Sequence, residues 1–272
     1  MRPARVALVT GASGGIGRAI AMRLVDDGYV ILAHYNRDAN GAARLSTELK
    51  ASGGVHHSIQ ANLSQPSGLA SLTKEVRRFL DRHPASALKA IVNNAGVMVG
   101  PSWESITVED YDRFLDVNTR APFFLIRELA QSMPRGGSIV NISSASAHIS
   151  SPANIAYAMS KAALESMTKN FAAALAIRGI RVNAVIPGYT NNGHAAFSDP
   201  SSLKYMASAA PLGDVGSPAD VAHAVSFLVS DLAARTTGSL LDVSGGTTLS
   251  PRTSQIGSVS ELAPRSDARA TS

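Results

Sequence analysis

Short apolar segments recur along the chain, separated by longer stretches in which apolar residues return every three or four positions. The short segments cover residues 6–10, 30–35, 57–61, 90–93, 138–142, 182–186 and 240–243. Continuous apolar sequence of this length is typical of parallel strands that are buried on both faces of a sheet. We therefore predict about seven parallel strands.

The longer stretches have the periodicity of helices, which parallel strands need as crossover connections. They predict helices over residues 16–26, 39–50, 69–82, 108–114, 119–132, 156–176 and 219–228. Gly28 and Gly179 follow two of these helices, where glycine favours a left-handed cap, and Ser217 and Pro218 open a third. The alternation predicts an α/β fold, a single-domain Rossmann-like doubly wound parallel sheet flanked by helices.

Two segments lie outside this alternation. Residues 189–216 combine Asn, Ser, Pro and Gly with scattered apolar residues, and we interpret them as a lid over a substrate. Residues 250–272 are rich in Ser, Thr, Arg, Ala and Pro without an apolar period, so they lack the burial that would offset the entropy of ordering. We expect one domain over residues 1–249, followed by a disordered C-terminal tail.

The composition excludes several classes of protein. The 272 residues are 45% hydrophobic and include no cysteine, so a substantial core is available, and disulfides and thiolate metal sites are excluded. No apolar run reaches the roughly 18 residues of a membrane-spanning helix, and no signal-peptide core is visible. We expect a cytoplasmic protein without a membrane partner.

The formal net charge of +5 does not indicate a polyanionic partner. Lys and Arg are scattered along the chain, whereas a nucleic-acid site needs basic residues clustered with aromatic stacking positions. We therefore expect no nucleic acid as a partner. We also expect no metal site, because no metal-ligand spacing with carboxylates is found for His56, His57, His148 and His194.

The first predicted strand ends in a glycine-rich turn, Thr10-Gly11-Ala12-Ser13-Gly14-Gly15-Ile16-Gly17, that leads into the first predicted helix. Glycines let the backbone approach a pyrophosphate closely, and the helix start offers unpaired N–H groups and the positive end of its dipole. A lone glycine cluster is more often an ordinary tight turn. Its place in a βαβ unit favours a dinucleotide-binding turn.

Candidate catalytic side chains follow the fifth predicted strand and lie in the next helix. Tyr157 and Lys161 are four residues apart, so they project from one helix face. Ser144 lies at the strand edge where ligands gather in open α/β sheets, with Ser143 as its non-catalytic neighbour. Asn118 lies at the start of a predicted helix, where capping is an additional role. Each residue alone is more often structural, so the hypothesis depends on their combination.

These motifs resemble those of the short-chain dehydrogenase/reductase family over residues 5–248. The glycine turn resembles the family's Thr-Gly-x-x-x-Gly-x-Gly, Asn93-Asn94-Ala95-Gly96 its Asn-Asn-Ala-Gly, and Tyr157 with Lys161 its Tyr-x-x-x-Lys. The resemblance implies four catalytic residues, Asn118, Ser144, Tyr157 and Lys161. It further implies that a nicotinamide cofactor contacts Gly11, Ser13, Gly14, Gly15, Ile16, Gly17, Tyr35, Asn36, Arg37, Asn62, Leu63, Asn94, Ala95, Gly96, Tyr157, Lys161, Pro187, Gly188 and Thr190.

The end of the second predicted strand discriminates between NADP(H) and NAD(H). Tyr35-Asn36-Arg37 replaces the acidic residue that would bind the ribose hydroxyls, and a guanidinium can bond a 2′-phosphate. The stretch is similar to that of pteridine reductases, so NADP(H) is favoured. Asp38 and the neutral Gly14 count against it, which leaves NAD(H) as the alternative. Asn62 stands where the family usually has an Asp near the adenine.

The resemblance also implies a mechanism. Ketone reduction moves a hydride to carbon and a proton to the developing alkoxide. Tyr157 would donate the proton, Ser144 would stabilise the substrate oxygen, and Asn118 would hold a water in the proton relay. A free phenol has a pKa of about 10, and we expect the ammonium of Lys161 to lower the pKa of Tyr157. Lys161 would also bond the nicotinamide ribose.

Two positions depart from the family pattern. Asn192 stands where a threonine usually follows Pro187 and Gly188, so Thr190 is the expected substitute for contacts to the nicotinamide. Ser244 stands where relatives often have an aspartate near a subunit interface. Because Asn192 replaces the usual threonine, the sequence leaves open which residues of this loop contact the cofactor.

The resulting hypothesis is an NADPH-preferring reductase of a small-molecule ketone, either a 3-oxoacyl thioester or a secondary-metabolite ketone. The alternatives are an NAD-linked alcohol dehydrogenase and a protein that binds a dinucleotide without chemistry; the four intact catalytic positions count against the latter. The resemblance also implies a homotetramer, with the helices around Thr119 and Ala156 at one interface.

Overall fold

The computed structural model describes residues 3–98, 100–193 and 195–249. The predicted tail, residues 250–272, lies outside the described residues, and so does His194 of the predicted lid. No described helix combines the length and the apolar content needed to cross a membrane.

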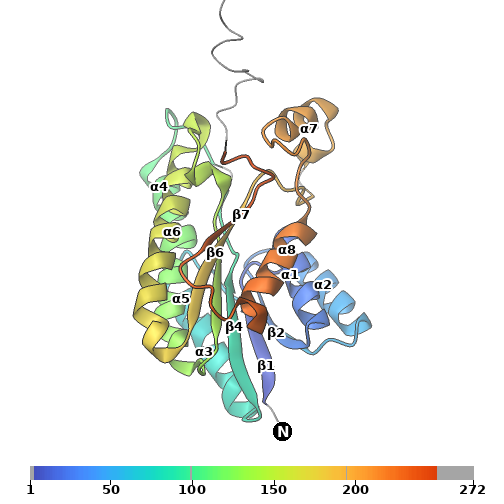
Figure 1. The fold of residues 1–272 in the computed structure, drawn as a ribbon, viewed down its shortest axis with the longest axis vertical. Coiled ribbons are helices and arrows are strands. Elements are labelled where there is room, and N and C mark those ends of the chain that lie inside the picture. The colour runs from blue at the N-terminus through green and yellow to red at the C-terminus, as the bar shows by residue number, and fades with distance from the viewer. Residues whose placement is uncertain (1–2, 99, 194, 250–272) are drawn as a thin grey trace, which may run out of the picture.

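Seven parallel strands form one sheet in the order β3-β2-β1-β4-β5-β6-β7 (Figure 1). Their bounds are β1 (Ala4–Val9), β2 (Tyr29–Tyr35), β3 (His56–Gln60), β4 (Ser86–Asn93), β5 (Ser138–Ile142), β6 (Arg181–Pro187) and β7 (Leu240–Val243). All seven predicted strands are confirmed. The strand order reverses between β1 and β4, which creates the crevice at the carboxyl edge where ligands bind in such sheets.

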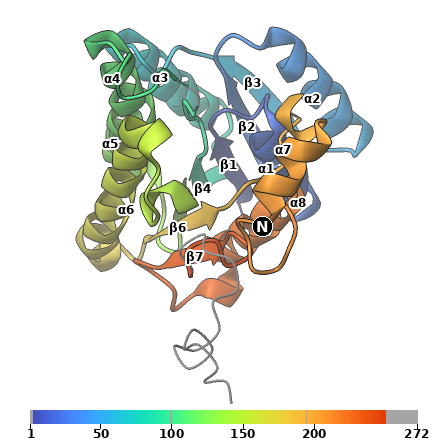
Figure 2. The same cartoon turned by 90° about the horizontal axis from the view of Figure 1, so that it is seen from above.

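Eight α-helices are found in the described residues. They are α1 (Gly15–Asp26), α2 (Ala39–Ala51), α3 (Pro66–Arg82), α4 (Val108–Leu115), α5 (Ala121–Leu129), α6 (Ile155–Leu175), α7 (Pro200–Ala207) and α8 (Pro218–Val229). Helices α1, α2 and α8 cover one face of the sheet, and α3, α4, α5 and α6 cover the other (Figure 2).

Strand residues fill a core on each side of the sheet. Leu8 and Leu32 pack with α3 and α5, whereas the next residues, Val9 and Ala33, pack with α1 and α2. Neighbouring residues of a strand point to opposite faces, so a sheet covered on both sides needs apolar residues at consecutive positions. This requirement explains why the strands were recognisable as continuous apolar segments.

The predicted helix ends are confirmed at three positions. Gly28 has φ 81° and Gly179 has φ 66°, the left-handed conformation that glycine adopts without steric cost. Ser217 accepts a hydrogen bond from the backbone of Asp220, whose carboxylate accepts one from the backbone of Ser217 in return. This capping box begins α8 just before Pro218.

Two expectations about helices were wrong in detail. The helix predicted over 119–132 is a π-helical turn at Asp116–Arg120 followed by α5 and a short 3₁₀ turn. The extra residue of the π turn breaks the 3.6-residue period that the prediction used. The predicted lid is not entirely irregular either, because it contains α7, whose N-terminus is capped by the carboxylate of Asp199.

Candidate active site

The glycine turn after β1 is packed too tightly for side chains at three of its predicted positions, Gly11, Gly15 and Gly17. A Cβ atom on Gly17 would lie 2.2 Å from the carbonyl oxygen of Gly11 and 2.5 Å from Nδ2 of Asn94. Gly11 has φ 65°, and a Cβ there would lie 2.9 Å from Cα of Ala95. The glycines therefore allow a close approach between the turn and the end of β4.

Hydrogen bonds fasten this turn to the Asn-Ala-Gly segment after β4. The hydroxyl of Thr10 accepts from the backbone N–H groups of Asn94 and Ala95, both at 3.0 Å. Nδ2 of Asn94 donates to the carbonyl oxygens of Thr10 and Gly11 at 2.9 and 3.1 Å. Gly96 follows, with Asn118 and Lys161 beside its Cα. Two predicted motifs thus form one rigid corner at the carboxyl edge of the sheet.

The start of α1 has the form of a phosphate-binding site. Gly14 is its N-cap residue and provides no side-chain cap, so the first N–H groups and the helix dipole are available to an anion. The surroundings of Gly14 are open, whereas Gly15 lies against the backbone of Asn192. Ser13 lies partly exposed beside this N-terminus, and Ile16 packs into the core from it. These residues fit the pyrophosphate of a dinucleotide.

The end of β2 presents the predicted Arg37 to solvent. Its guanidinium forms no ion pair with any described residue. The carboxylate of Asp38, expected to count against a phosphate, accepts from the backbone N–H of Gly41 and caps α2. The carboxylate of Asp38 therefore has a structural role as a helix cap. An anion bound beside Arg37 would face the positive guanidinium.

The other predicted residues on the adenine side lie close together. Asn36 donates to Oδ1 of Asn62 at 3.5 Å, and the same oxygen accepts from the backbone and side chain of Ser64. Tyr35 is the last residue of β2, and Leu63 is buried in the core beneath. The structure thus places these four predicted residues around the ends of β2 and β3.

His34 is a structural contributor that the sequence reasoning missed. Its Nδ1 accepts from the backbone N–H of Gly11 at 3.1 Å, and its Nε2 lies 3.0 Å from the carbonyl oxygen of Ala61. Burial lowers the pKa of His34 to about 4, so the ring is neutral and can accept at one nitrogen and donate at the other. A polar residue in an otherwise apolar strand was the available signal.

A buried ladder of amides connects the sheet to α6. Asn93 donates to Asn141 of β5 at 2.8 Å, and Asn141 donates to the hydroxyl of Thr168 at 2.8 Å. All three residues are buried. Hydrogen-bonded buried polar groups fix relative positions more sharply than apolar packing does. The ladder therefore holds α6, which carries Tyr157 and Lys161, in register with β4 and β5.

Three of the four predicted catalytic residues come together between α6 and the end of β5. Tyr157 and Lys161 are buried on one face of α6, and the hydroxyl of Ser144 lies close enough to the phenol of Tyr157 to influence its pKa. Nζ of Lys161 lies 5.8 Å from the ring centroid of Tyr157 and donates to the carbonyl oxygen of Ile142 at 2.7 Å. A phenol, a hydroxyl and an ammonium thus occupy one small region at the carboxyl edge.

The ionisation of Tyr157 differs from the expectation. Burial raises the pKa of its phenol, and the hydrogen bond with Ser144 opposes that rise, but the predicted lowering by Lys161 is absent. The reason is the cost of burying a phenolate, together with the separation of the ammonium, which is bonded to Ile142. Burial lowers the pKa of Lys161 itself to about 8, and the charge of Glu165 opposes this shift.

Asn118, the fourth predicted catalytic residue, does not cap a helix. It lies in the π-helical turn, where its Oδ1 accepts from the backbone N–H of Val97 at 2.8 Å. Its Nδ2 donates to the carbonyl oxygen of Val97 and to the hydroxyl of Ser160, both at 2.9 Å. The capping role was wrong, because the side chain instead connects the segment after β4 to α6.

The segment after β6 supplies the remaining predicted cofactor residues. Pro187 ends β6, and Gly188 is packed so closely that a Cβ would lie 2.8 Å from the carbonyl oxygen of Ser244. Thr190 is buried and donates to the carbonyl oxygen of Gly188 at 3.2 Å. Thr190 also pairs with Gly216 in an isolated parallel bridge, which fastens the two ends of the predicted lid together.

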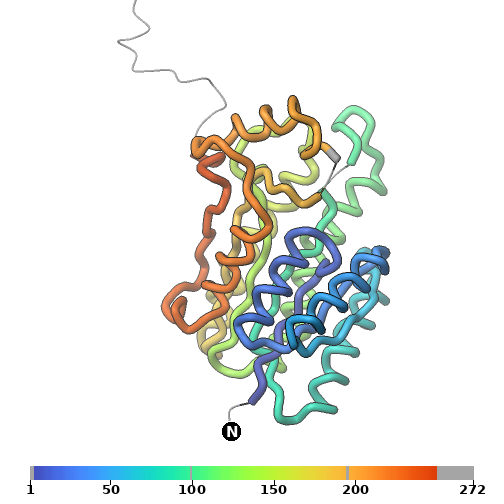
Figure 3. Tube along the Cα trace, turned by 90° about the vertical axis from the view of Figure 1, so that its right-hand side faces the viewer, coloured from blue at the N-terminus to red at the C-terminus, as the bar shows by residue number. Residues whose placement is uncertain are grey.

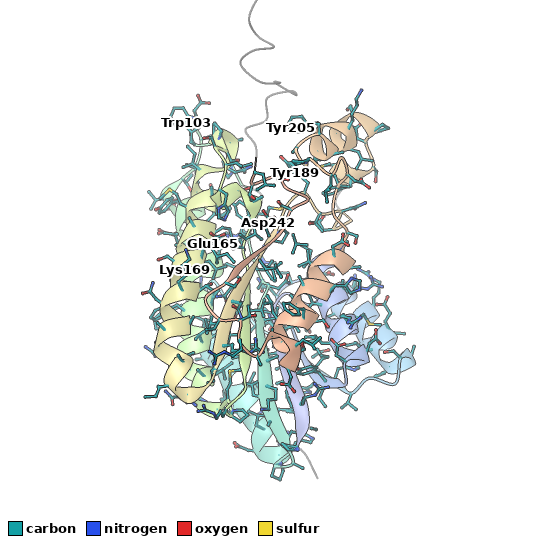
Figure 4. All side chains as sticks on the ribbon, viewed as in Figure 1. Trp103, Glu165, Lys169, Tyr189, Tyr205 and Asp242 are labelled. Atoms are coloured by element: carbon teal, nitrogen blue, oxygen red, sulfur yellow. The ribbon has the colours of Figure 1, made fainter. Side chains whose placement is uncertain are left out.

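Large side chains that we call the aromatic rim lie on the segments that follow β4 and β6 at the carboxyl edge of the sheet. We define the rim as Met98, Trp103, Tyr189 and Tyr205. Trp103 lies on the α4 side and Tyr205 on α7 across from it, with Tyr189 below Tyr205 (Figure 4). Met98, Trp103 and Tyr205 are 47%, 60% and 57% exposed. Large apolar side chains at the open end of a reaction site are suited to contact an extended apolar molecule.

Comparisons with known proteins agree with this geometry. The family model described as enoyl-(acyl carrier protein) reductase matches residues 11–248. The chain is 34% identical to the 3-oxoacyl-[acyl-carrier-protein] reductase FabG of Staphylococcus aureus over 248 residues, which cover 90% of this chain and 99% of the relative.

Two solved structures of ketoreductases are also similar. The angucycline C-6 ketoreductase LanV with bound NADP has 40% identity and a TM-score of 0.86, covering 90% of this chain and 96% of that one. The reductase LugOII, which catalyses keto-reduction at C1 during lugdunomycin biosynthesis, has 38% identity and a TM-score of 0.87, covering 92% and 100%. The chain therefore belongs to the short-chain dehydrogenase/reductase family of NAD(P)-dependent oxidoreductases.

Proposed function

We propose that this protein reduces a ketone on a fused-ring aromatic molecule, with NADPH as the hydride donor and Tyr157 as the proton donor. The observation that carries the proposal is the convergence of Ser144, Tyr157 and Lys161 beside the glycine turn. A protein that only bound a dinucleotide would have no need for a buried phenol and a buried ammonium at this edge, since burying ionisable groups is costly.

The preference for NADPH is supported by the end of β2. Arg37 is exposed without an ion pair to any described residue, and Asp38 is turned into the cap of α2. A guanidinium in this place can form forked bonds with a 2′-phosphate. LanV, the most identical of the structures compared above, holds NADP. NAD(H) is the alternative that the cofactor assay below separates.

The chain's own residues have defined parts in the reaction. When bound, the reduced nicotinamide would supply the hydride to the carbonyl carbon. A raised pKa keeps the phenol of Tyr157 protonated at neutral pH, which is the state that a proton donor needs. The hydroxyl of Ser144 can donate to the carbonyl oxygen and stabilise the charge that develops there. Lys161, with a pKa of about 8, is mostly charged at neutral pH, and the carbonyl oxygen of Ile142 holds its ammonium in the site.

The aromatic rim supports a fused-ring substrate, the class to which angucyclines belong. Flat aromatic molecules gain from stacking on exposed aromatic side chains, and Trp103 and Tyr205 supply them on opposite sides. A 3-oxoacyl thioester is the second candidate because FabG is a relative. Residues 189–216 include one lysine, Lys204, against Asp199 and Asp214, so this segment offers no basic surface to the phosphate of a carrier arm.

A homotetramer in the cytoplasm is the assembly that we propose. The outer faces of α5 and α6 expose Phe123, Ile155 and Met159 to between 43% and 48%. Phe123 also contacts Phe171 across these two helices, with ring centroids 5.3 Å apart. Exposed apolar faces of neighbouring helices favour association with a second copy. Sedimentation equilibrium should give a tetramer, and a monomer at micromolar concentration would reject this part of the proposal.

The proposed function is tested by NADPH consumption with a panel of ketones. The panel should contain fused-ring aromatic ketones, a 3-oxoacyl thioester and small alicyclic ketones, each assayed with NADPH and with NADH. We expect the highest kcat/KM with a fused-ring ketone and NADPH. Faster turnover of the thioester, or a preference for NADH, would contradict the corresponding part of the proposal.

Tyr157→Phe provides the matched test of the proton donor. Loss of a general acid typically reduces turnover about 100- to 10,000-fold, and we expect a loss in this range with unchanged NADPH affinity. Tyr111→Phe is the control, because Tyr111 packs against the same small cluster as Tyr157 but has no part in the proposed mechanism. A Tyr157→Phe enzyme that retained its activity would contradict the assignment.

A further inference from the structure

Glu165 is a buried carboxylate next to the catalytic residues that the proposed mechanism does not use. It lies on α6 four residues beyond Lys161 and eight beyond Tyr157, so the three side chains share one face of the helix. Figure 4 shows Glu165 on the side of α6 that faces the sheet. Its exposure is 7%. A buried carboxylate is costly unless it is paired, so its partners indicate what it does.

The first partner is Ser143, which lies between Ile142 and Ser144 at the end of β5. Its hydroxyl donates to Oε1 of Glu165 at 2.5 Å. On one side of it, the carbonyl oxygen of Ile142 accepts from Lys161, and on the other side lies the catalytic serine. Three consecutive residues at the end of β5 therefore face three successive turns of α6. Ile142 contacts Lys161, Ser143 contacts Glu165, and Ser144 lies beside Tyr157.

The second partner is His148, which follows the short 3₁₀ turn at Ala145–Ala147. Its Nε2 lies 3.0 Å from each carboxylate oxygen of Glu165. Ser143 and His148 lie at the two ends of the segment that contains Ser144. Glu165 thus fastens both ends of this segment to α6, and the catalytic hydroxyl is held between them.

The charge of Glu165 also acts on Lys161. Burial favours the neutral amine, and the negative charge of Glu165 opposes this by favouring the ammonium. The titratable groups that face Glu165 in the described residues are Lys161 from α6 and His148 from the segment after β5, and Asp242 of β7 lies near His148. Without Glu165, Lys161 would be a buried cation with one carbonyl as its described partner.

We propose that Glu165 is a positioning residue of the active site, which holds the Ser144 segment against α6 and places a carboxylate one helical turn from Lys161. Its effect on turnover rests on the proposed reductase function. Its effect on the ionisation of Lys161 does not rest on that function, so each effect can be refuted without refuting the other.

The direct test is the titration of Lys161 by the ¹³Cε chemical shift of labelled lysine, with the signal identified by its loss in Lys161→Met. Glu165→Gln removes the charge while keeping the shape. We expect the midpoint of Lys161 to fall by roughly one pH unit in this variant. Asp81→Asn is the control, because it removes an exposed carboxylate from the end of α3 and should leave the midpoint unchanged. An unchanged midpoint in Glu165→Gln would overturn the proposal.

The pH profile of kcat/KM supplies the second measurement. A lower pKa of Lys161 means that the ammonium is lost at lower pH, so the alkaline limb of Glu165→Gln should move to lower pH. Glu165→Asp retains the charge and should restore the limb. A wild-type protein that reduced no ketone would reject the proposed function, while the titration of Lys161 would still decide this inference.

Ser143→Ala separates the two roles of Glu165. It removes one tie to the Ser144 segment and leaves the carboxylate in place, so the midpoint of Lys161 should stay near its wild-type value while kcat falls several-fold at constant NADPH affinity. If Glu165→Gln does not fold, Glu165→Asp and Ser143→Ala decide the question. Wild-type kcat in Ser143→Ala would then contradict the positioning role.

Discussion

The glycine turn after β1 and the segment 189–216 meet where Gly15 lies against the backbone of Asn192, with most of the segment above the turn in Figure 3, but they are held in different ways. The turn is fixed by four hydrogen bonds between Thr10, Gly11, Asn94 and Ala95. The segment 189–216 is fastened at its base, where Thr190 pairs with Gly216, and exposes large side chains above it.

We infer from this difference that the turn governs cofactor binding and turnover, whereas the segment 189–216 governs which ketone is accepted. The cofactor edge is rigid, so small changes there should remove binding or turnover altogether. The rim belongs to segments with exposed side chains, so changes there should alter which ketone is accepted while the chemistry continues. The following predictions test this division, beginning with the largest effect.

Gly17→Ala should abolish useful cofactor binding. Its Cβ would lie 2.2 Å from the carbonyl oxygen of Gly11, so the turn must shift, and we expect NADPH affinity to fall about 100-fold. Fluorescence titration of NADPH measures the loss. Gly14→Ala is the matched variant in the same turn, since its Cβ would have open space. Equal losses in the two variants would show that close packing is not what the turn requires.

Arg37→Ser should change the choice of cofactor. A charged hydrogen bond to the 2′-phosphate is worth about 1.5–3 kcal/mol, so the KM for NADPH should rise at least tenfold while the KM for NADH changes little. Arg44→Ser, which removes another exposed arginine from the nearby α2, is the control. A similar rise in KM for NADPH and NADH would show that Arg37 does not recognise the 2′-phosphate.

Tyr205→Ala should alter selectivity at the rim. Loss of an aromatic contact of about 0.5–1.5 kcal/mol should raise the KM for a fused-ring ketone roughly three- to tenfold, with kcat nearly unchanged. The kcat/KM for a small alicyclic ketone should stay the same, because such a molecule has no aromatic ring to stack on Tyr205. An equal loss for both ketones would indicate that Tyr205 supports the fold of the lid instead.

Thr168→Val should affect stability more than turnover. It leaves Nδ2 of buried Asn141 without its partner, at a cost of about 1–3 kcal/mol in the free energy of unfolding. Thermal denaturation measures this cost, and we expect kcat to fall less than threefold at a temperature where the variant is folded. A large loss of kcat without a loss of stability would mean that the amide ladder takes part in the reaction.

Most of the fold could be predicted because both faces of its sheet are covered. Strands such as β1 and β5 then read as continuous apolar segments, and the helices between them follow. The π-helical turn at Asp116–Arg120 could not be predicted from a 3.6-residue period, since an inserted residue is invisible to it. Helix α7 was missed although Asp199 and Pro200 give an ordinary helix start, because the eight-residue helix lies among Ser, Pro and Gly.

The site could be predicted where its residues are close in sequence. Tyr157 and Lys161 are four apart, and Ser144 precedes them by a short connection. His34 and Glu165 were missed because their roles depend on partners from other elements, which no local pattern reveals. Glu165 nevertheless continues the four-residue spacing of Tyr157 and Lys161, which was a signal available in the sequence.

The central claim is that Ser144 and Tyr157 act as one unit on a ketone oxygen. Its most direct test is a double-mutant cycle in kcat for the best ketone with NADPH, comparing Ser144→Ala, Tyr157→Phe and the double variant. Residues that act as a unit give non-additive losses, so the double variant should be about as slow as the slower single variant. Losses that multiply in the double variant would contradict the account.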